Sequence, residues 1–163
     1  MSKNSSSAIG LLLLGFAGFG SCSYSPDSYS CFSAIDPAEG WAYGDSFVYM
    51  PEIQDSLCNG RLSLLVRHTN DYPFANLWVE VKSQQPDSNG VKIVTDTFCI
   101  TLADIYGNWQ GRGSGATIER LDTLYADFPL ISGAPLRLRH VMRPERVEGI
   151  ETVGFIFEPN SLK

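Results

Sequence analysis

Short segments in which apolar and polar residues alternate dominate this chain from residue 44 onward. In the segment 77–82, the odd-numbered residues are Leu, Val and Val, whereas the even-numbered residues are Trp, Glu and Lys. A period of two residues places successive side chains on opposite faces of a β-strand. Similar segments are found at 46–50, 61–68, 94–102, 136–142 and 152–157. The pattern predicts half-buried antiparallel strands.

Turn-forming residues separate these segments, at 86–90, at 107–115 and at 132–133. No window shows convincing helical spacing, although Pro144 and Gly149 would suit the two ends of one helical turn. Regularly spaced strands joined by such turns are typical of a sandwich or barrel. We therefore predict an all-β fold, an antiparallel, jelly-roll-like β-sandwich, formed as a single domain by residues 44–159.

The start of the chain has the layout of a secretory signal peptide: one cation, Lys3, precedes an apolar run from Ala8 to Phe19. The run is too short to cross a membrane, which takes about 20 apolar residues. The residues Phe19-Gly20-Ser21-Cys22 resemble a bacterial lipoprotein processing box.

We predict a leader over residues 1–21, acylation of Cys22, and a tether over residues 22–43 between the lipid and the fold. Each acyl CH₂ contributes about 0.8 kcal/mol to membrane binding, so several chains anchor a protein durably. An acidic cluster after the acylated cysteine sends some lipoproteins to the cell surface. Here only one acidic residue, Asp27, follows Cys22 closely, which favours the periplasmic side. We expect a lipid-anchored protein of the cell envelope, on the outer membrane and facing the periplasm. The alternative is ordinary cleavage that leaves Cys22 free or in a disulfide.

Charge and cysteine content narrow the possible ligands. The net charge of −6 opposes general nucleic-acid binding, which requires clustered cations. Besides Cys22, we expect free buried thiols, although an oxidising compartment would permit one disulfide, for which Cys31–Cys58 is favoured because both residues lie near the start of the chain. No two cysteines have CxxC spacing, so we expect no metal site and no cofactor.

The sequence offers little for catalysis. The only histidines are His68 and His140, and neither lies near a nucleophile-elbow pattern. His140 shares the parity of the apolar residues of 136–142, which favours a place in the core or at its rim. No two of the 18 acidic residues can be singled out as a glycosidase pair. We therefore expect a protein that is not an enzyme.

Two features are candidates for binding a partner. Trp109 lies in the glycine-rich segment 107–115, where it would either cover the core or contact a partner or a sugar ring. Arg137 and Arg139 would share one outward strand face, with Arg143 close by, and Arg binds carboxylate and phosphate with two hydrogen bonds. The alternative for the arginines is a solvated face that is balanced by Glu145, Glu148 and Glu151.

Three segments resemble motifs of the gliding-motility lipoprotein GldH family of Bacteroidota. They are Arg67-His68-Thr69-Asn70-Asp71-Tyr72-Pro73-Phe74-Ala75-Asn76-Leu77-Trp78, Gly107-Asn108-Trp109-Gln110-Gly111, and a closing block with Met142-Arg143, Gly149-Ile150 and Val153-Gly154. They appear in the family's order over residues 44–158. The resemblance implies an envelope lipoprotein whose partners are proteins of the gliding machinery and its allied secretion system. It supplies no catalytic residues, and relatives in bacteria that do not glide leave motility itself open.

The sequence thus predicts a non-catalytic interaction protein, held at the membrane by Cys22. The alternative is a glycan-binding lipoprotein module in which Trp78, Trp109 and Trp41 stack on sugar rings. A small hydrolase is a third hypothesis.

Overall fold

The computed structural model describes residues 28–160, so the predicted leader and Cys22 lie outside the described residues. No helix occurs among these residues, and hence none that could cross a membrane. In chain order the strands are β1 (Tyr29–Ala34), β2 (Trp41–Ala42), β3 (Phe47–Tyr49), β4 (Leu57–Thr69), β5 (Asn76–Asp87), β6 (Gly90–Thr101), β7 (Arg112–Ser114), β8 (Thr117–Ile131), β9 (Leu136–His140), β10 (Arg146–Val147) and β11 (Ile150–Pro159).

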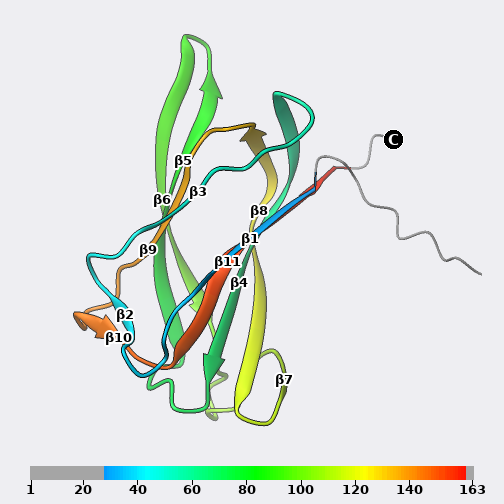
Figure 1. The fold of residues 1–163 in the computed structure, drawn as a ribbon. Helices are drawn as coiled ribbons and strands as arrows, with labels where there is room; N and C mark the ends of the chain where they lie inside the picture. The colour runs from blue at the N-terminus through cyan, green and yellow to red at the C-terminus, as the bar shows by residue number, and fades with distance from the viewer. Residues whose placement is uncertain (1–27, 161–163) are drawn as a thin grey trace, which may run out of the picture.

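Two sheets pack face to face (Figure 1). The five-stranded sheet has the order β1-β11-β4-β8-β7, and the four-stranded sheet has the order β3-β9-β5-β6. A small third sheet pairs β10 with β2. Every strand pairing is antiparallel, and the chain crosses repeatedly between the two large sheets. The predicted all-β sandwich is therefore confirmed.

The core is apolar and lies between the two large sheets. On the long strands that the sequence pattern predicted, alternate residues point inward. The fully buried side chains include Leu62, Leu64 and Val66 of β4, Leu77 and Val79 of β5, Leu138 of β9, and Val153, Phe155 and Phe157 of β11. The residues of opposite parity on each strand point to the outer surface, where they can bind a partner.

The fold begins earlier than the sequence indicated. Residues 29–34, which fall within the predicted tether, form β1 at one edge of the five-stranded sheet. Serines occupy both faces of this strand, so its sequence does not alternate between apolar and polar residues. The neighbouring strand β11 fits closely against it. Phe32 lies directly opposite Gly154 of β11, and a Cβ at Gly154 would lie 2.0 Å from the Cys31 carbonyl oxygen.

Two further elements differ from the prediction. The 15-residue strand β8 was not predicted, because charged residues occur on both of its faces and Pro129 interrupts it. The expected helical turn at 144–149 is absent. Instead, Val147 is buried and pairs with Trp41 across β10 and β2.

A candidate docking groove and a cationic sheet face

An apolar groove of about 400 Å³ lies at one end of the four-stranded sheet, and we refer to it as the Trp78 groove. Trp78 points away from the core because Leu77 and Val79 point into it, and the indole is 43% exposed. The segment that follows β9 forms the other wall. The Val141 amide donates to the Trp78 carbonyl (2.9 Å), and the Trp78 amide donates to Met142 Sδ (3.3 Å). The complete lining is Phe74, Trp78, Val141, Met142, Arg143 and Pro144.

The outer face of the same sheet continues from the groove as a charged surface. Arg139 donates to both carboxylate oxygens of Glu80, at 2.8 and 2.9 Å. These hydrogen bonds lower the pKa of Glu80. One step further along the strands, Lys82 and Arg137 are exposed and directly opposite each other. We refer to these two residues as the cationic pair.

Like charges placed directly opposite on a sheet repel each other, so they destabilise the fold unless an anion lies between them. Within the described residues, neither Arg137 nor Arg143 forms an ion pair. The outer face of the four-stranded sheet therefore combines an apolar groove with cations that are free to meet carboxylates.

The structure brings three of the predicted binding residues to this one face. Arg137 and Arg139 share it, as the strand parity predicted, and Arg143 lines the groove. The sequence did not identify Phe74, Met142, Pro144 or Lys82 as part of it. One sequence feature could have indicated this face: Trp78 and Lys82 share the outward parity of one strand, and a large aromatic side chain on a polar face is unusual.

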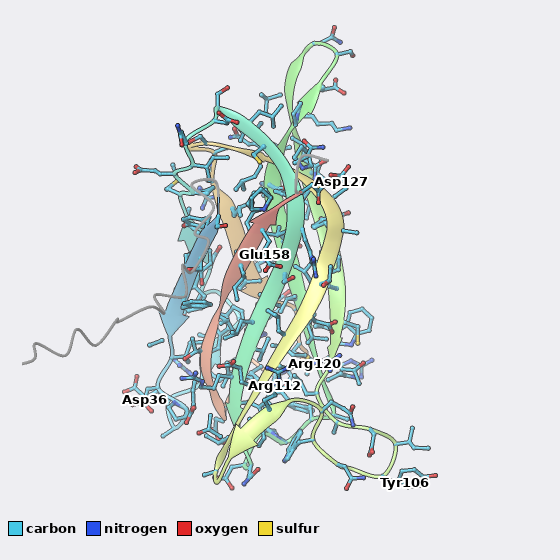
Figure 2. All side chains as sticks on the ribbon, turned by 90° about the vertical axis from the view of Figure 1, so that its right-hand side faces the viewer. Asp36, Tyr106, Arg112, Arg120, Asp127 and Glu158 are labelled. Carbon is cyan, nitrogen blue, oxygen red and sulfur yellow. The ribbon has the colours of Figure 1, made fainter. Side chains whose placement is uncertain are left out.

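Trp109 does not belong to this face. It is half-buried, packs against the core, and meets the His68 ring edge-on at a centroid distance of 4.5 Å. The loop that it closes projects from the end of the sandwich and carries the exposed Tyr106 (Figure 2). Trp41 is also buried, at 1% exposure. Because only Trp78 is well exposed, the three tryptophans do not form the common platform that a glycan-binding module of this kind would use.

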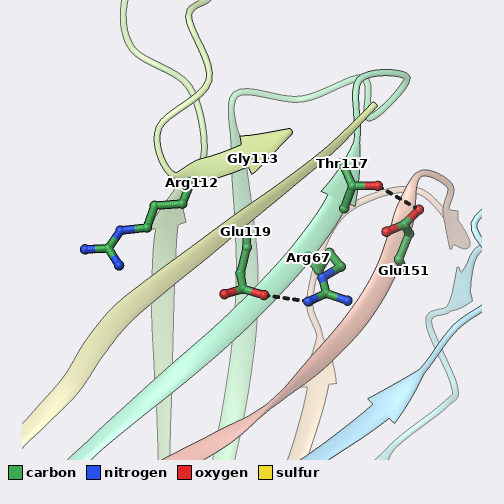
Figure 3. A pocket seen from close by; sticks show the side chains of 6 residues that line it. All are labelled: Arg67, Arg112, Gly113, Thr117, Glu119 and Glu151. Atoms are coloured by element: carbon green, nitrogen blue, oxygen red, sulfur yellow. Dashed lines mark hydrogen bonds and ion pairs between the residues drawn. The ribbon is translucent and has the colours of Figure 1, made fainter. Parts of the chain in front are cut away.

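A second, polar cleft of about 410 Å³ lies on the five-stranded sheet (Figure 3). Arg67 donates to Glu119 at 2.7 Å, and Thr117 donates to Glu151 at 3.3 Å. A glycosidase needs two carboxylates that are available as acid and as base or nucleophile. Here each carboxylate is engaged by a neighbour, and Arg112 points away from both (Figure 3).

The two histidines lie in the interior of the fold, whereas the described cysteines are half-buried or exposed. His68 and His140 are both fully buried, and burial lowers the pKa of each. Cys31 is a free thiol, as expected by default, and the permitted Cys31–Cys58 disulfide is not formed. Burial raises the pKa of the Cys31 thiol. Cys99 is also free and is exposed on β6. Among the described residues, no cluster of three or more metal-binding side chains occurs.

These observations define the class of the protein: it is an all-β sandwich with an apolar groove and a cationic outer face on one sheet. The chain belongs to the GldH lipoprotein family, whose family model matches residues 29–156. No curated protein matches the chain. One similar solved structure is described as Xyl-CBM35 in complex with a glucuronic acid-containing disaccharide. It is 18% identical, covers 81% of this chain and 79% of that chain, and superposes with a TM-score of 0.36.

Proposed function

We propose that this protein is a lipid-anchored envelope lipoprotein that docks protein partners on the outer face of its four-stranded sheet without catalysing a reaction. The partners would be envelope proteins of the gliding machinery or of its allied secretion system. The Trp78 groove is the observation that carries the proposal.

The groove has the composition of a docking site. Aromatic residues, Met and Arg are enriched at protein interfaces, and Trp and Arg dominate their binding energy. The groove presents Trp78, Phe74, Met142 and Arg143 together. The sequence gives a further reason. Phe74 and Trp78 belong to one of the segments that resemble GldH motifs, and Met142-Arg143 belongs to another. Two motifs that are far apart in the sequence thus form the two walls of one groove.

The charges define the chemistry of the partner. The chain carries a net charge of −6, yet among the described residues neither Arg143 nor the cationic pair forms an ion pair, although the charge of Lys82 helps to lower the pKa of Glu80. A fitting partner segment would place an apolar side chain against Trp78 and carboxylates against these cations. Because Arg139 is already bound to Glu80, it would contribute less to the interface than Arg137.

Cys22 would supply the anchor. Replacing Cys22 by Ala should abolish metabolic labelling with palmitate and release the protein from the membrane fraction. Cys99→Ala is the matched control, since Cys99 is exposed, and it should label like the wild type. Unchanged labelling of Cys22→Ala would contradict the anchor.

The groove can be tested by substitution. Combining Trp78→Ala with Arg143→Glu should reduce the recovery of cross-linked envelope proteins from intact cells at least about tenfold, which corresponds to a loss of about 1.4 kcal/mol. The control combines Leu121→Ala with Arg61→Glu, two exposed positions on the other sheet. Equal recovery from the two double variants, both of them folded, would contradict docking at the groove.

A further inference from the structure

Strand β6 forms a long open edge of the sandwich. It pairs with β5 over its whole length, from Gly90 to Thr101, and no strand pairs with its other side. Among the other edges of the two large sheets, β1 has six residues, and β3 and β7 have three each. Because β7 covers only residues 117–119 of β8, the rest of β8 is a second long edge, but it contains Pro129 and its pairing with β4 shifts register. An open edge presents unpaired amide and carbonyl groups that can bind another strand.

The open edge of β6 lacks two of the usual protections against strand pairing. Prolines and β-bulges normally interrupt an exposed edge. Strand β6 contains no proline, and its register with β5 runs without a shift. Its side chains Val91 and Ile93 are 57% and 64% exposed, which leaves aliphatic surface beside the open edge.

The charges on β6 are self-complementary. When a strand pairs with its own copy about a two-fold axis, residues that are equally distant from the axis lie opposite each other and share a face. If the axis passes through Val94, Lys92 of one copy lies opposite Asp96 of the other, and this ion pair forms twice. In the same register, Ile93 faces Thr95 and Val91 faces Thr97, so the exposed aliphatic side chains gain cross-strand neighbours.

Asp96 gives an independent reason for this register. Its half-buried carboxylate accepts a hydrogen bond from Tyr125 of the opposite sheet, and it has no cation partner among the described residues. Among the described residues, the one ion pair of Lys92 is with Asp87, at a distance of 3.8 Å between two exposed side chains. An exposed pair of this kind contributes little and is easily exchanged. In the paired register, Lys92 of a second copy would supply the missing cation.

We propose that the protein forms a two-fold dimer in which the β6 strands of two copies pair antiparallel about Val94, joining the four-stranded sheets into one continuous sheet. The partner is a second copy of this chain, selected by the reciprocal Lys92–Asp96 contacts. The dimer does not use the Trp78 groove, so it stands or falls independently of the proposed docking function.

Disulfide trapping in cells that express the full-length lipoprotein tests the register. In the dimer the two copies of residue 94 have Cα atoms about 4.5–5.5 Å apart, within reach of a disulfide, so Val94→Cys should give a covalent dimer. Thr97→Cys is the matched control on the same strand. Its two copies lie about 20 Å apart along the strands and should not cross-link. Cross-linking of both variants, or of neither, would overturn the proposal.

Charge reversal tests the ion pairs. Lys92→Glu in the Val94→Cys background should reduce the trapped dimer at least about fivefold, and adding Asp96→Lys should restore it. Light scattering of the detergent-solubilised wild-type protein should give the protein mass of two chains, and Lys92→Glu should shift it toward one. A wild-type protein with the mass of one chain, or an unchanged dimer in Lys92→Glu, would contradict the proposal even if Asp96→Lys impairs folding.

Discussion

Arg139 and Glu80 face each other across β9 and β5 and form an ion pair with two parallel hydrogen bonds, of 2.8 and 2.9 Å. The Arg139 guanidinium also lies over the ring of Tyr43, 5.8 Å from its centroid. The next residue of this face, Arg137, has no such partner and lies opposite Lys82. Two arginines that sequence parity treats as equivalent therefore differ: one is held within the fold, and the other is free.

This difference predicts different effects of the same substitution. Arg139→Gln should lower the free energy of unfolding by up to about 1 kcal/mol, since the pair is partly exposed. Arg137→Gln should leave it unchanged or raise it slightly, because it relieves repulsion from Lys82. Urea unfolding at neutral pH measures both values. Equal destabilisation by the two substitutions would contradict the assignment.

The buried histidines predict a dependence of stability on pH. Burial lowers the pKa of His68 and His140 in the folded protein, so the unfolded chain binds protons that the folded chain does not. Stability should be complete above the unfolded pKa of about 6.5 and should fall below it, by at most about 1.4 kcal/mol per pH unit for each histidine. His140→Phe, which keeps a ring against Trp41, should lose less stability than the wild type between pH 7.5 and 5.5. Chemical unfolding at the two pH values measures the loss. An equal loss of unfolding free energy in the wild type and in His140→Phe would contradict a contribution from His140.

The two partly accessible tryptophans should separate stability from binding. Trp109 packs against His68 and the core, so Trp109→Ala should cost about 2 kcal/mol or more of folding free energy. Trp78 lines an open groove, so Trp78→Ala should change stability by less than about 1 kcal/mol. Thermal unfolding of the two variants compares them directly. A larger loss for Trp78→Ala would mean that the groove is part of the folded core and not a docking site.

Gly154 allows β1 to join the sandwich. A Cβ at this position would meet the backbone of β1 at 2.0 Å, and the Phe32 ring lies within 2.6 Å of the same point. Gly154→Ala should therefore loosen β1 and raise amide hydrogen exchange across residues 29–34. Gly44→Ala is the control, since nothing lies within 4 Å of a Cβ there. Equal exchange in the two variants would show that β1 tolerates the added methyl group.

The sequence predicted the sandwich because its central strands are buried on one face only. Where one face is buried and the other is wet, alternation is clear, as in 77–82. Strands β1 and β8 were not predicted because neither has one clearly apolar face and one clearly polar face. One has small polar residues on both faces, and the other lies beside the short edge strand β7, where Arg120 and Asp122 remain partly exposed.

The binding face was predictable in part. Strand parity placed Arg137 and Arg139 together, and outward parity marked Trp78. Parity within one strand cannot show that the segment after β9 folds back beside β5 and brings Met142 and Arg143 against Trp78. It also could not show that the side chain of Trp109 turns inward onto His68, because that depends on how two loops pack at the end of the sandwich.

Photo-cross-linking from within the groove tests docking at the Trp78 groove most directly. Benzoylphenylalanine placed at position 78 of the full-length lipoprotein should, on irradiation of intact cells, give a discrete adduct with an envelope protein. The adduct should be lost when Arg143→Glu is added. The same probe at position 121, which is 51% exposed on the other sheet, should give no such adduct. The same adduct from both positions, or none from position 78, would contradict a docking site at this groove.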